Sequence, residues 1–433
     1  MFKRILIGIA ILVAVATIGL FALAWRPAIK PIDPRSAGNF PQALIAQGEM
    51  LAFAGNCASC HTTPGAQTFT GGLAFPTPFG TVYSTNITPD PETGIGRWSE
   101  EAFTRALHEG VARDGSHLYP VFPFDHFTKI RDDDVKALYA YFMTREALKA
   151  TAQRNTVPFP LNIRAVQAGW KLLFFHEGVY QPDTAKSEAW NRGAYLAEGL
   201  AHCAACHTPR NALGASKSGA DDYSGAMING WFAPALTSAN TAPLPWTQDE
   251  LYLYLRNGAT ALHGVAAGSM SEVVHDSLSK LPDADVQAIT VYFSDMNQSA
   301  TLAARSGETL AKAMQTSGLG ATQELDAGAA VYLTACAACH YNSGSMPAMV
   351  RPELALNSAL TAADPTNLIQ VVLHGVSRKD GIPGVLMPGF ARALSDADIA
   401  ILSAYLRRTR TDRPAWKDLD ATIAAIRKEA DAS

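Results

Sequence analysis

The chain has 433 residues, of which 48% are hydrophobic and 17% are charged. This length exceeds one ordinary core and corresponds to about three domains of roughly 150 residues each. The composition can bury several cores, which excludes wholesale disorder. The 35 basic and 39 acidic side chains give a net charge of -4, without the basic excess that nucleic-acid binding usually needs. We therefore expect no nucleic-acid partner.

The first predicted element is an apolar helix at the start of the chain. Lys3 and Arg4 precede an uncharged run over residues 5–25, which as a helix spans about 30 Å, the thickness of one bilayer core. Residues 22–24, Ala-Leu-Ala, also resemble a signal-peptidase site, but a cleaved leader usually carries a shorter apolar stretch. We expect segment 1–34 to be an uncleaved membrane anchor, with a cleaved signal as the alternative. Basic residues on both sides leave its orientation open.

All six cysteines belong to one pattern, Cys-x-x-Cys-His, that occurs three times. The three frames are Cys57, Cys60 and His61; Cys203, Cys206 and His207; and Cys336, Cys339 and His340. Two thiols at this spacing can each add to a vinyl group of a haem while the adjacent His binds the iron. The pattern therefore predicts three covalently bound haem c groups, and hence iron.

Other uses of paired cysteines fit the spacing less well. A zinc site needs further ligands within about 12 to 20 residues, whereas successive frames begin 146 and 133 residues apart. A dithiol redox site has no use for a His that follows the second cysteine in every frame.

The frames lie within longer repeats. A glycine precedes the first cysteine of each frame by nine, ten and eight residues, at Gly48, Gly193 and Gly328. Downstream, an Asp-x-Asp motif with Val or Ile begins at Asp132, Asp283 and Asp396, and the same offset leads to Tyr141-Phe142, Tyr292-Phe293 and Tyr405-Leu406. Acidic residues before an apolar run of helical period suit a helix N-terminus, and Ser395 with Asp398 approximates a capping box. Each repeat also has an amphipathic segment that ends in Gly, at 98–110, 246–258 and 364–375.

These repeats predict an all-α fold of three tandem cytochrome c-type helical domains after an N-terminal transmembrane helix. We place the domains at 42–150, 185–298 and 323–410, with linkers at 151–184 and 299–322 and a C-terminal tail at 411–433. The tyrosines of the terminal helices are expected to pack on the initial helices rather than to contact haem.

The iron of each haem needs a second axial ligand for fast electron transfer, and Met or His is the usual choice. In the third repeat we predict Met387, on a turn 51 residues after Cys336, with Met346 and Met349 as rivals. In the second repeat we predict Met270, 67 residues after Cys203, with His275 and His263 as alternatives.

The first repeat departs from this rule. The residue 65 positions after Cys57 is Phe122, which cannot bind iron. His126 lies four residues further on and is the predicted ligand, with His117, Met143 and His108 as alternatives. Exchange of Met for His lowers the reduction potential of iron, so haem 1 is expected to have the lowest potential of the three.

Two stretches and the three frames resemble a known family. The stretches are GGLAFPTPFGTVYSTNITPDPETGIGRWS at 71–99 and PELALNSAL at 352–360. They are similar to the three-haem cytochrome c subunits of membrane-associated periplasmic dehydrogenases that oxidise alcohols, aldehydes, polyols or gluconate. Relatives usually carry Met before Pro where this chain has Phe122. The variant Phe-Pro-Phe-Asp-His-Phe at 122–127 resembles the branch that accompanies molybdenum-dependent aldehyde or N-heterocycle oxidoreductases.

The resemblance implies an electron-transfer subunit with no substrate site of its own. Such a subunit takes electrons from a large catalytic dehydrogenase subunit of molybdopterin, quinoprotein or flavin type. It passes them to ubiquinone in the cytoplasmic membrane or to a terminal oxidase. Because c-type haem is attached after the chain has crossed the membrane, we expect the haem domains on the periplasmic side of a bacterial cytoplasmic membrane.

A haem enzyme of peroxidase type is the alternative function. Phe122 motivates it, because a haem 1 without a strong second ligand would leave an open position for a small oxidant. We find no Gly-rich dinucleotide motif and no Ser-His-Asp arrangement that the spacing supports.

Overall fold

The computed structural model describes residues 2–34, 40–319, 326–341, 348–377, 380, 382 and 384–431. These residues form two compact units. The first comprises Met1–Asp183 and Tyr195–His202, and the second comprises Thr184–Ala194 and Cys203–Ser433. The first unit therefore holds the N-terminal segment and the first repeat, and the second unit holds most of the second repeat and the third.

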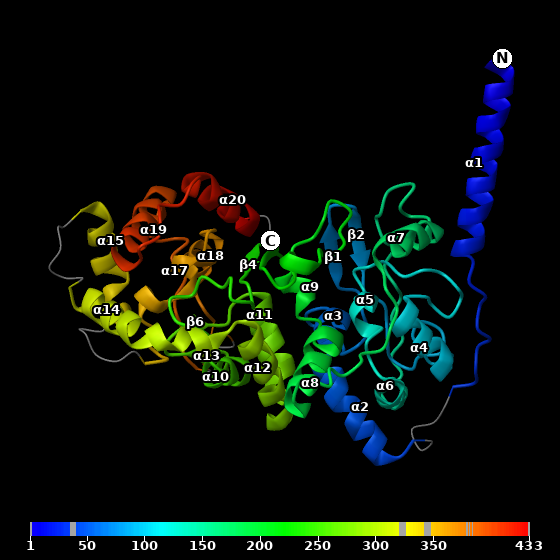
Figure 1. Cartoon of the computed structure of the whole chain (residues 1–433), viewed down its shortest axis with the longest axis horizontal. Coiled ribbons are helices and arrows are strands. Elements are labelled where there is room, and N and C mark those ends of the chain that lie inside the picture. Colours follow the sequence, from blue (N-terminus) through cyan, green and yellow to red (C-terminus); the bar gives the residue numbers. More distant parts are fainter. Residues whose placement is uncertain are drawn as a thin grey trace. The chain divides into compact units, whose positions relative to one another are not determined.

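The described residues are mostly helical, as predicted (Figure 1). The N-terminal segment and first repeat contain α1 (Phe2–Ala24), α2 (Gln42–Ala54), α3 (Cys57–His61), β1 (Ala74–Thr77), β2 (Gly80–Tyr83), α4 (Glu100–Glu109), α5 (Phe124–Phe127) and α6 (Asp132–Met143). Then follow η2 (Arg164–Val166) and α7 (Gln167–Phe174). Three short antiparallel hairpins, β1 with β2, β3 with β4 and β5 with β6, add to the predicted all-α fold.

The second and third repeats, like the first, have a helix before the frame, a short helix at the frame and a later helix that begins with the Asp-x-Asp motif. The second contains α8 (Glu188–Tyr195), η3 (Leu196–Leu200), α9 (Ala204–His207), η4 (Gly219–Asp221), β3 (Ala226–Ile228), β4 (Trp231–Ala233), α10 (Gln248–Asn257), β5 (Ala259–Thr260), β6 (Gly264–Val265), α11 (Ser269–Glu272), η5 (Val273–Ser277), η6 (Leu278–Lys280) and α12 (Asp283–Met296). It is followed by α13 (Ser299–Leu302), η7 (Ala303–Arg305) and α14 (Ser306–Leu319). The third contains α15 (Ala327–Ala335), α16 (Ala337–His340), η8 (Leu354–Leu356), α17 (Ser358–Thr361), α18 (Thr366–His374), α19 (Asp396–Arg410) and α20 (Leu419–Asp431).

In every repeat the helix before the frame, called the initial helix (α2, α8 or α15), crosses the helix that begins with the Asp-x-Asp motif, called the terminal helix (α6, α12 or α19). The crossing lies at a glycine. A Cβ atom on Gly48 of α2 would lie 2.0 Å from the carbonyl oxygen of Ala137 in α6, and one on Gly193 of α8 would lie 1.9 Å from that of Ala288 in α12. On Gly328 of α15 it would lie 2.5 Å from Cβ of Tyr405 in α19. No side chain fits at these distances, so the backbones can approach each other only because the residue is Gly. The predicted role of the tyrosines in packing is confirmed, because Tyr141, Tyr292 and Tyr405 contact these three glycines.

Local sequence sets the ends of the helices. Ser99 caps α4 by accepting a hydrogen bond from the N–H of Ala102, and Thr247 caps α10 by accepting one from the N–H of Glu250. The predicted capping box of Ser395 and Asp398 is present at the start of α19. α4 and α10 end at Gly110 and Gly258, whose positive φ values of 62° and 78° favour glycine.

The stretches expected to be linkers and tail contain helices. Segment 151–184 includes α7, and segment 299–322 includes α13, η7 and the whole of α14. Part of segment 411–433 forms α20, whose buried Ile423 and Ile426 join the core of the third repeat. The spacing of Ile423 and Ile426 places both on one helix face, which is why this face is covered by the repeat.

The N-terminal segment is helical, but its relation to a membrane stays a prediction. Among the residues that the structure describes, none of the helices combines the length and the apolar character needed to cross a bilayer. Met1 and several side chains of α1, which fall within the predicted anchor 1–34, lie outside the described residues.

Gly48→Ala should destabilise the first repeat. A glycine to alanine change in a helix normally stabilises it by about 1 kcal/mol, but here the new methyl group collides with the backbone of α6, and overpacking costs about 1 to 3 kcal/mol. Denaturant titration followed by circular dichroism measures the change. Gly307→Ala is the matched control, because nothing lies within 4 Å of a Cβ atom at Gly307 of α14. Equal stability of the two variants would contradict a close crossing at Gly48.

Candidate functional site

Each Cys-x-x-Cys-His frame lies on a short helix directly after an initial helix. The three helices are α3, α9 and α16. Asn56 and His202, which precede the first two frames, have positive φ values of 47° and 35°, so the chain turns sharply between the two helices. None of the six cysteines forms a disulfide.

The surroundings of the first cysteine of each frame favour a thiol over a thiolate. Burial, reinforced by the second cysteine of the frame, raises the pKa of Cys57 and Cys203 to about 12 and that of Cys336 to about 11. An activated redox dithiol would need the opposite shift, because the thiolate is the nucleophile. The frames therefore do not suit a thioredoxin-like role.

The histidine of each frame is oriented by a backbone carbonyl. Nδ1 of His61 lies 2.6 Å from the carbonyl oxygen of Thr85. Nδ1 of His207 lies 2.7 Å from that of Pro234, and Nδ1 of His340 lies 3.4 Å from that of Pro352. Burial lowers the pKa of all three imidazoles, which favours the neutral ring. A neutral ring that donates from Nδ1 keeps the lone pair on Nε2 for a metal ion.

Two of the hairpins deliver these carbonyls. Thr85 lies two residues after β2, and Pro234 directly follows β4. In each case the strands bring a residue 24 or 27 positions from the histidine back to its ring. The short hairpins therefore serve the histidines of the first two frames.

The donor set fits haem c better than zinc. Two thiols and a neutral imidazole at this spacing are what covalent attachment and axial ligation of a haem require. Among the described residues, no group of three or more His, Cys, Asp or Glu side chains could hold a metal ion.

Known proteins share this organisation. A family model for cytochrome c matches residues 45–146 and 325–410, around the first and third frames. The fructose dehydrogenase cytochrome subunit of Gluconobacter japonicus is 38% identical over 402 residues, which are 87% of this chain and 81% of that protein. The gluconate 2-dehydrogenase cytochrome c subunit of Pantoea cypripedii is 38% identical over 404 residues, 89% of this chain and 90% of that protein. The chain belongs to the cytochrome c subunits of membrane-bound dehydrogenases.

A relative of higher identity is much longer than this chain. It is a subunit of the nicotinate dehydrogenase of Pseudomonas putida, 46% identical over 418 residues, which are 95% of this cytochrome c subunit. The matched residues make up only 34% of the relative, so the chain spans about a third of that protein's length. The family predicted from the frames and from the stretches at 71–99 and 352–360 is thereby confirmed.

In the third repeat of the cytochrome c subunit, Met387 is held at the end of α18. Its backbone pairs with that of Val376 through hydrogen bonds of 3.0 and 3.1 Å. Gly375 permits this approach, because its φ is 77° and a Cβ atom there would lie 2.3 Å from the oxygen of Met387. Of the rivals, Met349 is 40% exposed and Met346 lies outside the described residues. Ligation by Met387 stays a prediction.

In the second repeat both histidine candidates have a buried ring nitrogen without a hydrogen-bond partner. Met270 lies in the first turn of α11, after Gly268, whose φ is 56° and where a Cβ atom would lie 2.4 Å from the ring of Trp231. His263 stacks on Trp246 with ring centroids 3.8 Å apart, and neither of its buried ring nitrogens has a hydrogen-bond partner. Nε2 of His275 is also buried without one. The structure thus leaves Met270 as a prediction and His263 and His275 as alternatives.

In the first repeat the structure separates the candidates. The ring of Phe122 packs edge-on against Phe127, with centroids 5.3 Å apart. His117 has both ring nitrogens engaged, Nε2 with the oxygen of Ala24 at 2.8 Å and Nδ1 with Nζ of Lys171 at 3.0 Å. His117 therefore has no lone pair left for iron.

Two further candidates in the first repeat, His108 and Met143, are held in other contacts: His108 by a hydrogen bond and Met143 by burial in a helix. Nε2 of His108 lies 2.9 Å from the oxygen of Ile130, and Met143 is buried in α6. His126 of α5 differs, because its Nδ1 lies 2.9 Å from the oxygen of Glu198 while its Nε2 is buried without a hydrogen-bond partner. That is the arrangement of an axial histidine held by a backbone carbonyl.

Sequence reasoning missed His202, which precedes Cys203. Its ring lies 6.3 Å from that of His126 and 5.7 Å from that of Phe127, measured between centroids. Burial, the nearby His126 and a bond to the backbone of Gly55 act on its pKa, and burial dominates and lowers the value to about 4. Its position next to the second frame was the available signal.

Replacing Cys336 and Cys339 together by Ala should remove one haem of three. Each frame draws both thiols from its own repeat, so the other two frames should still be loaded. Mass spectrometry of the intact chain, matured in a host with a cytochrome c assembly system, counts the haems. The same pair of changes at Cys57 and Cys60 is the control for independence of the frames. A chain that still carries three haems would contradict the assignment.

Proposed function

We propose that this cytochrome c subunit carries three haem c groups and relays electrons from a periplasmic dehydrogenase to ubiquinone or a terminal oxidase. The observation that carries the proposal is the threefold pairing of a frame histidine with a backbone carbonyl, at Thr85, Pro234 and Pro352. Bound haem iron supplies one-electron chemistry, and the chain has to hold it in place with fixed ligands.

The residues divide this task between covalent attachment and axial ligation. Cys57, Cys60, Cys203, Cys206, Cys336 and Cys339 supply the thioether bonds, and His61, His207 and His340 supply one axial nitrogen each. On the opposite side of each iron we place His126, Met270 and Met387. A His ligand in the first repeat and Met in the other two would make haem 1 the lowest in potential, because Met ligation raises the potential.

The catalytic partner is proposed to act on an N-heterocycle or an aldehyde with a molybdenum cofactor. Two observations support this choice over a quinoprotein or flavin partner. The sequence at 122–127 resembles the branch that accompanies such enzymes, and the relative at 46% identity is named as a subunit of nicotinate dehydrogenase. Since the chain spans about a third of that relative, the catalytic function would reside elsewhere.

Residues 5–25 are proposed to anchor the haem domains to the cytoplasmic membrane. The run has no charged residue, and all of it except Trp25 lies in the single helix α1. An anchor confines the haems to the membrane surface and raises their effective concentration toward a quinone-linked acceptor.

Substrate of the partner enzyme should reduce the haems, and a short-chain ubiquinone should reoxidise them. The subunit is purified with the large protein that accompanies it, which mass spectrometry identifies, and haem absorbance is followed anaerobically after substrate is added. A molybdopterin enzyme is the expected partner. Haems that stay oxidised while substrate is consumed would contradict the relay.

His126→Ala should convert haem 1 from low spin to high spin, because the free Nε2 is the proposed ligand. Low-temperature paramagnetic resonance of the oxidised chain reports this change. His126→Met should instead keep haem 1 low spin and raise its potential, and the change of the exposed His176 to Ala is the control. An unchanged low-spin spectrum in His126→Ala would remove His126 from the ligands, and a high-spin haem in the unaltered chain would favour the peroxidase alternative.

A further inference from the structure

Helix α7 buries two of its polar residues and exposes two of its leucines. Gln167 and Lys171, one turn apart, are its two buried residues. Leu172 and Leu173, by contrast, are 71% and 65% exposed. A surface helix in water normally buries its leucines and exposes its lysine. The outer face of α7 is therefore suited to a non-aqueous neighbour.

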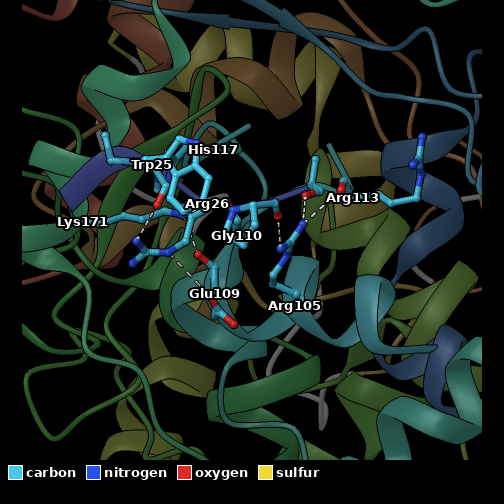
Figure 2. A network of polar contacts seen from close by, with 11 residues as sticks. Trp25, Arg26, Arg105, Glu109, Gly110, Arg113, His117 and Lys171 are labelled. Carbon is cyan, nitrogen blue, oxygen red and sulfur yellow. Dashed lines mark hydrogen bonds and ion pairs between the residues drawn. The ribbon is translucent and has the colours of Figure 1, made fainter. Parts of the chain in front are cut away.

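The inward position of Lys171 is well satisfied. Its Nζ donates to the carbonyl oxygens of Glu109 and Gly110 at 2.5 and 2.7 Å, and to Nδ1 of His117 at 3.0 Å (Figure 2). The two carbonyls belong to the end of α4, where the helix dipole favours a positive group. The ring of Phe124 lies 4.7 Å from the same nitrogen. These contacts hold Lys171 inside and so keep Leu172 and Leu173 outside.

The same cluster also fastens the end of α1. His117 donates from Nε2 to the oxygen of Ala24, the last residue of α1. Arg105 donates to the oxygen of Pro27, and Arg113 donates to that of Ile29. Figure 2 shows Lys171, His117, Arg105 and Arg113 gathered around this part of the chain. Helices α1 and α7 are in contact within the first unit.

More exposed apolar side chains come from the segments next to α1 and α7. Trp25, directly after α1, is 70% exposed, and Phe159 and Ile163, which precede α7, are 79% and 43% exposed. Along α1 itself the exposed large apolar side chains are Phe2, Ile5, Leu6, Ile7, Ile11, Leu12, Val15 and Ile18. Large apolar side chains that gather on a surface mark an interaction site.

The geometry points to a lipid-docking face formed by Trp25, Phe159, Ile163, Leu172 and Leu173, which enters the headgroup region of a bilayer beside α1. This inference rests on the membrane attachment proposed above and adds a second contact with the lipid. The choice of lipid follows from continuity with the apolar side chains of α1, to which α7 is tied through His117. Trp is also the side chain that membrane interfaces favour, and helices with an apolar outer face lie in that region.

A dye placed on Leu173 tests the face in the complete haem-loaded chain. If the six native cysteines are bound to haem, Leu173→Cys supplies the only free thiol for an environment-sensitive fluorophore. The labelled protein is incorporated into vesicles of phosphatidylethanolamine and phosphatidylglycerol that contain lipids with a nitroxide quencher near the headgroup. Leu213→Cys is the matched control, because Leu213 is a leucine of similar exposure, 53%, in the second repeat.

Quenching at position 173 together with none at position 213 is the expected result. Adding Leu172→Asp to the labelled chain should reduce the quenching about threefold or more, because a charge on this face opposes entry into the interface. Equal, weak quenching at both positions in protein that floats with the vesicles would overturn the inference. So would protection of the dye by the dehydrogenase subunit without lipid, which would identify a protein partner instead.

The labelling step separates this inference from the proposed function. One dye per chain shows that the native thiols are bound to haem, so a negative quenching result then counts against the docking face alone. More than one dye per chain would count against the three-haem assignment. In that case quenching at position 173 is measured after mass spectrometry has located the dye, and its absence there still overturns the docking face.

Discussion

The hydrogen bond from each frame histidine to a backbone carbonyl is the constraint on which the haem sites depend. With Nδ1 engaged and the neutral ring favoured, Nε2 is the nitrogen that keeps its lone pair for iron. The carbonyls of Thr85 and Pro234 reach the histidines because a hairpin directs the chain back after the frame. A small amount of β-structure in a mostly helical protein therefore has a direct role in the chemistry of the first two sites.

The packing of the helices and their order along the chain place the frame histidines. The glycines at positions 48, 193 and 328 let the initial and terminal helices of each repeat cross closely, and the frame follows directly after the initial helix. The frame thus follows a close helix crossing at which no side chain fits on the glycine position. The crossing recurs in all three repeats, as does the Cys-x-x-Cys-His frame, which is consistent with three haems.

The first repeat departs from the other two both in its candidate ligand and in its surroundings. Phe122 packs against Phe127, and His126 is the proposed ligand in place of a thioether. His117, a reasonable candidate by sequence, instead links the end of α1 to Lys171. The repeat that carries the proposed lowest-potential haem is therefore also the one to which the N-terminal helix is fastened.

The sequence determined the features that depend on neighbouring residues: the three frames, the starts of the terminal helices at Asp132, Asp283 and Asp396, and the capping box at Ser395. These follow from short spacings and from the local chemistry of helix ends. Only the tertiary structure decided which histidine nitrogens are engaged, that the segment 411–433 contributes to a core, and that Lys171 points inward. Ala24 and His117 are 93 residues apart, and His117 and Lys171 are 54 apart. Contacts over such separations arise from packing of distant elements, and no periodicity within one segment records them.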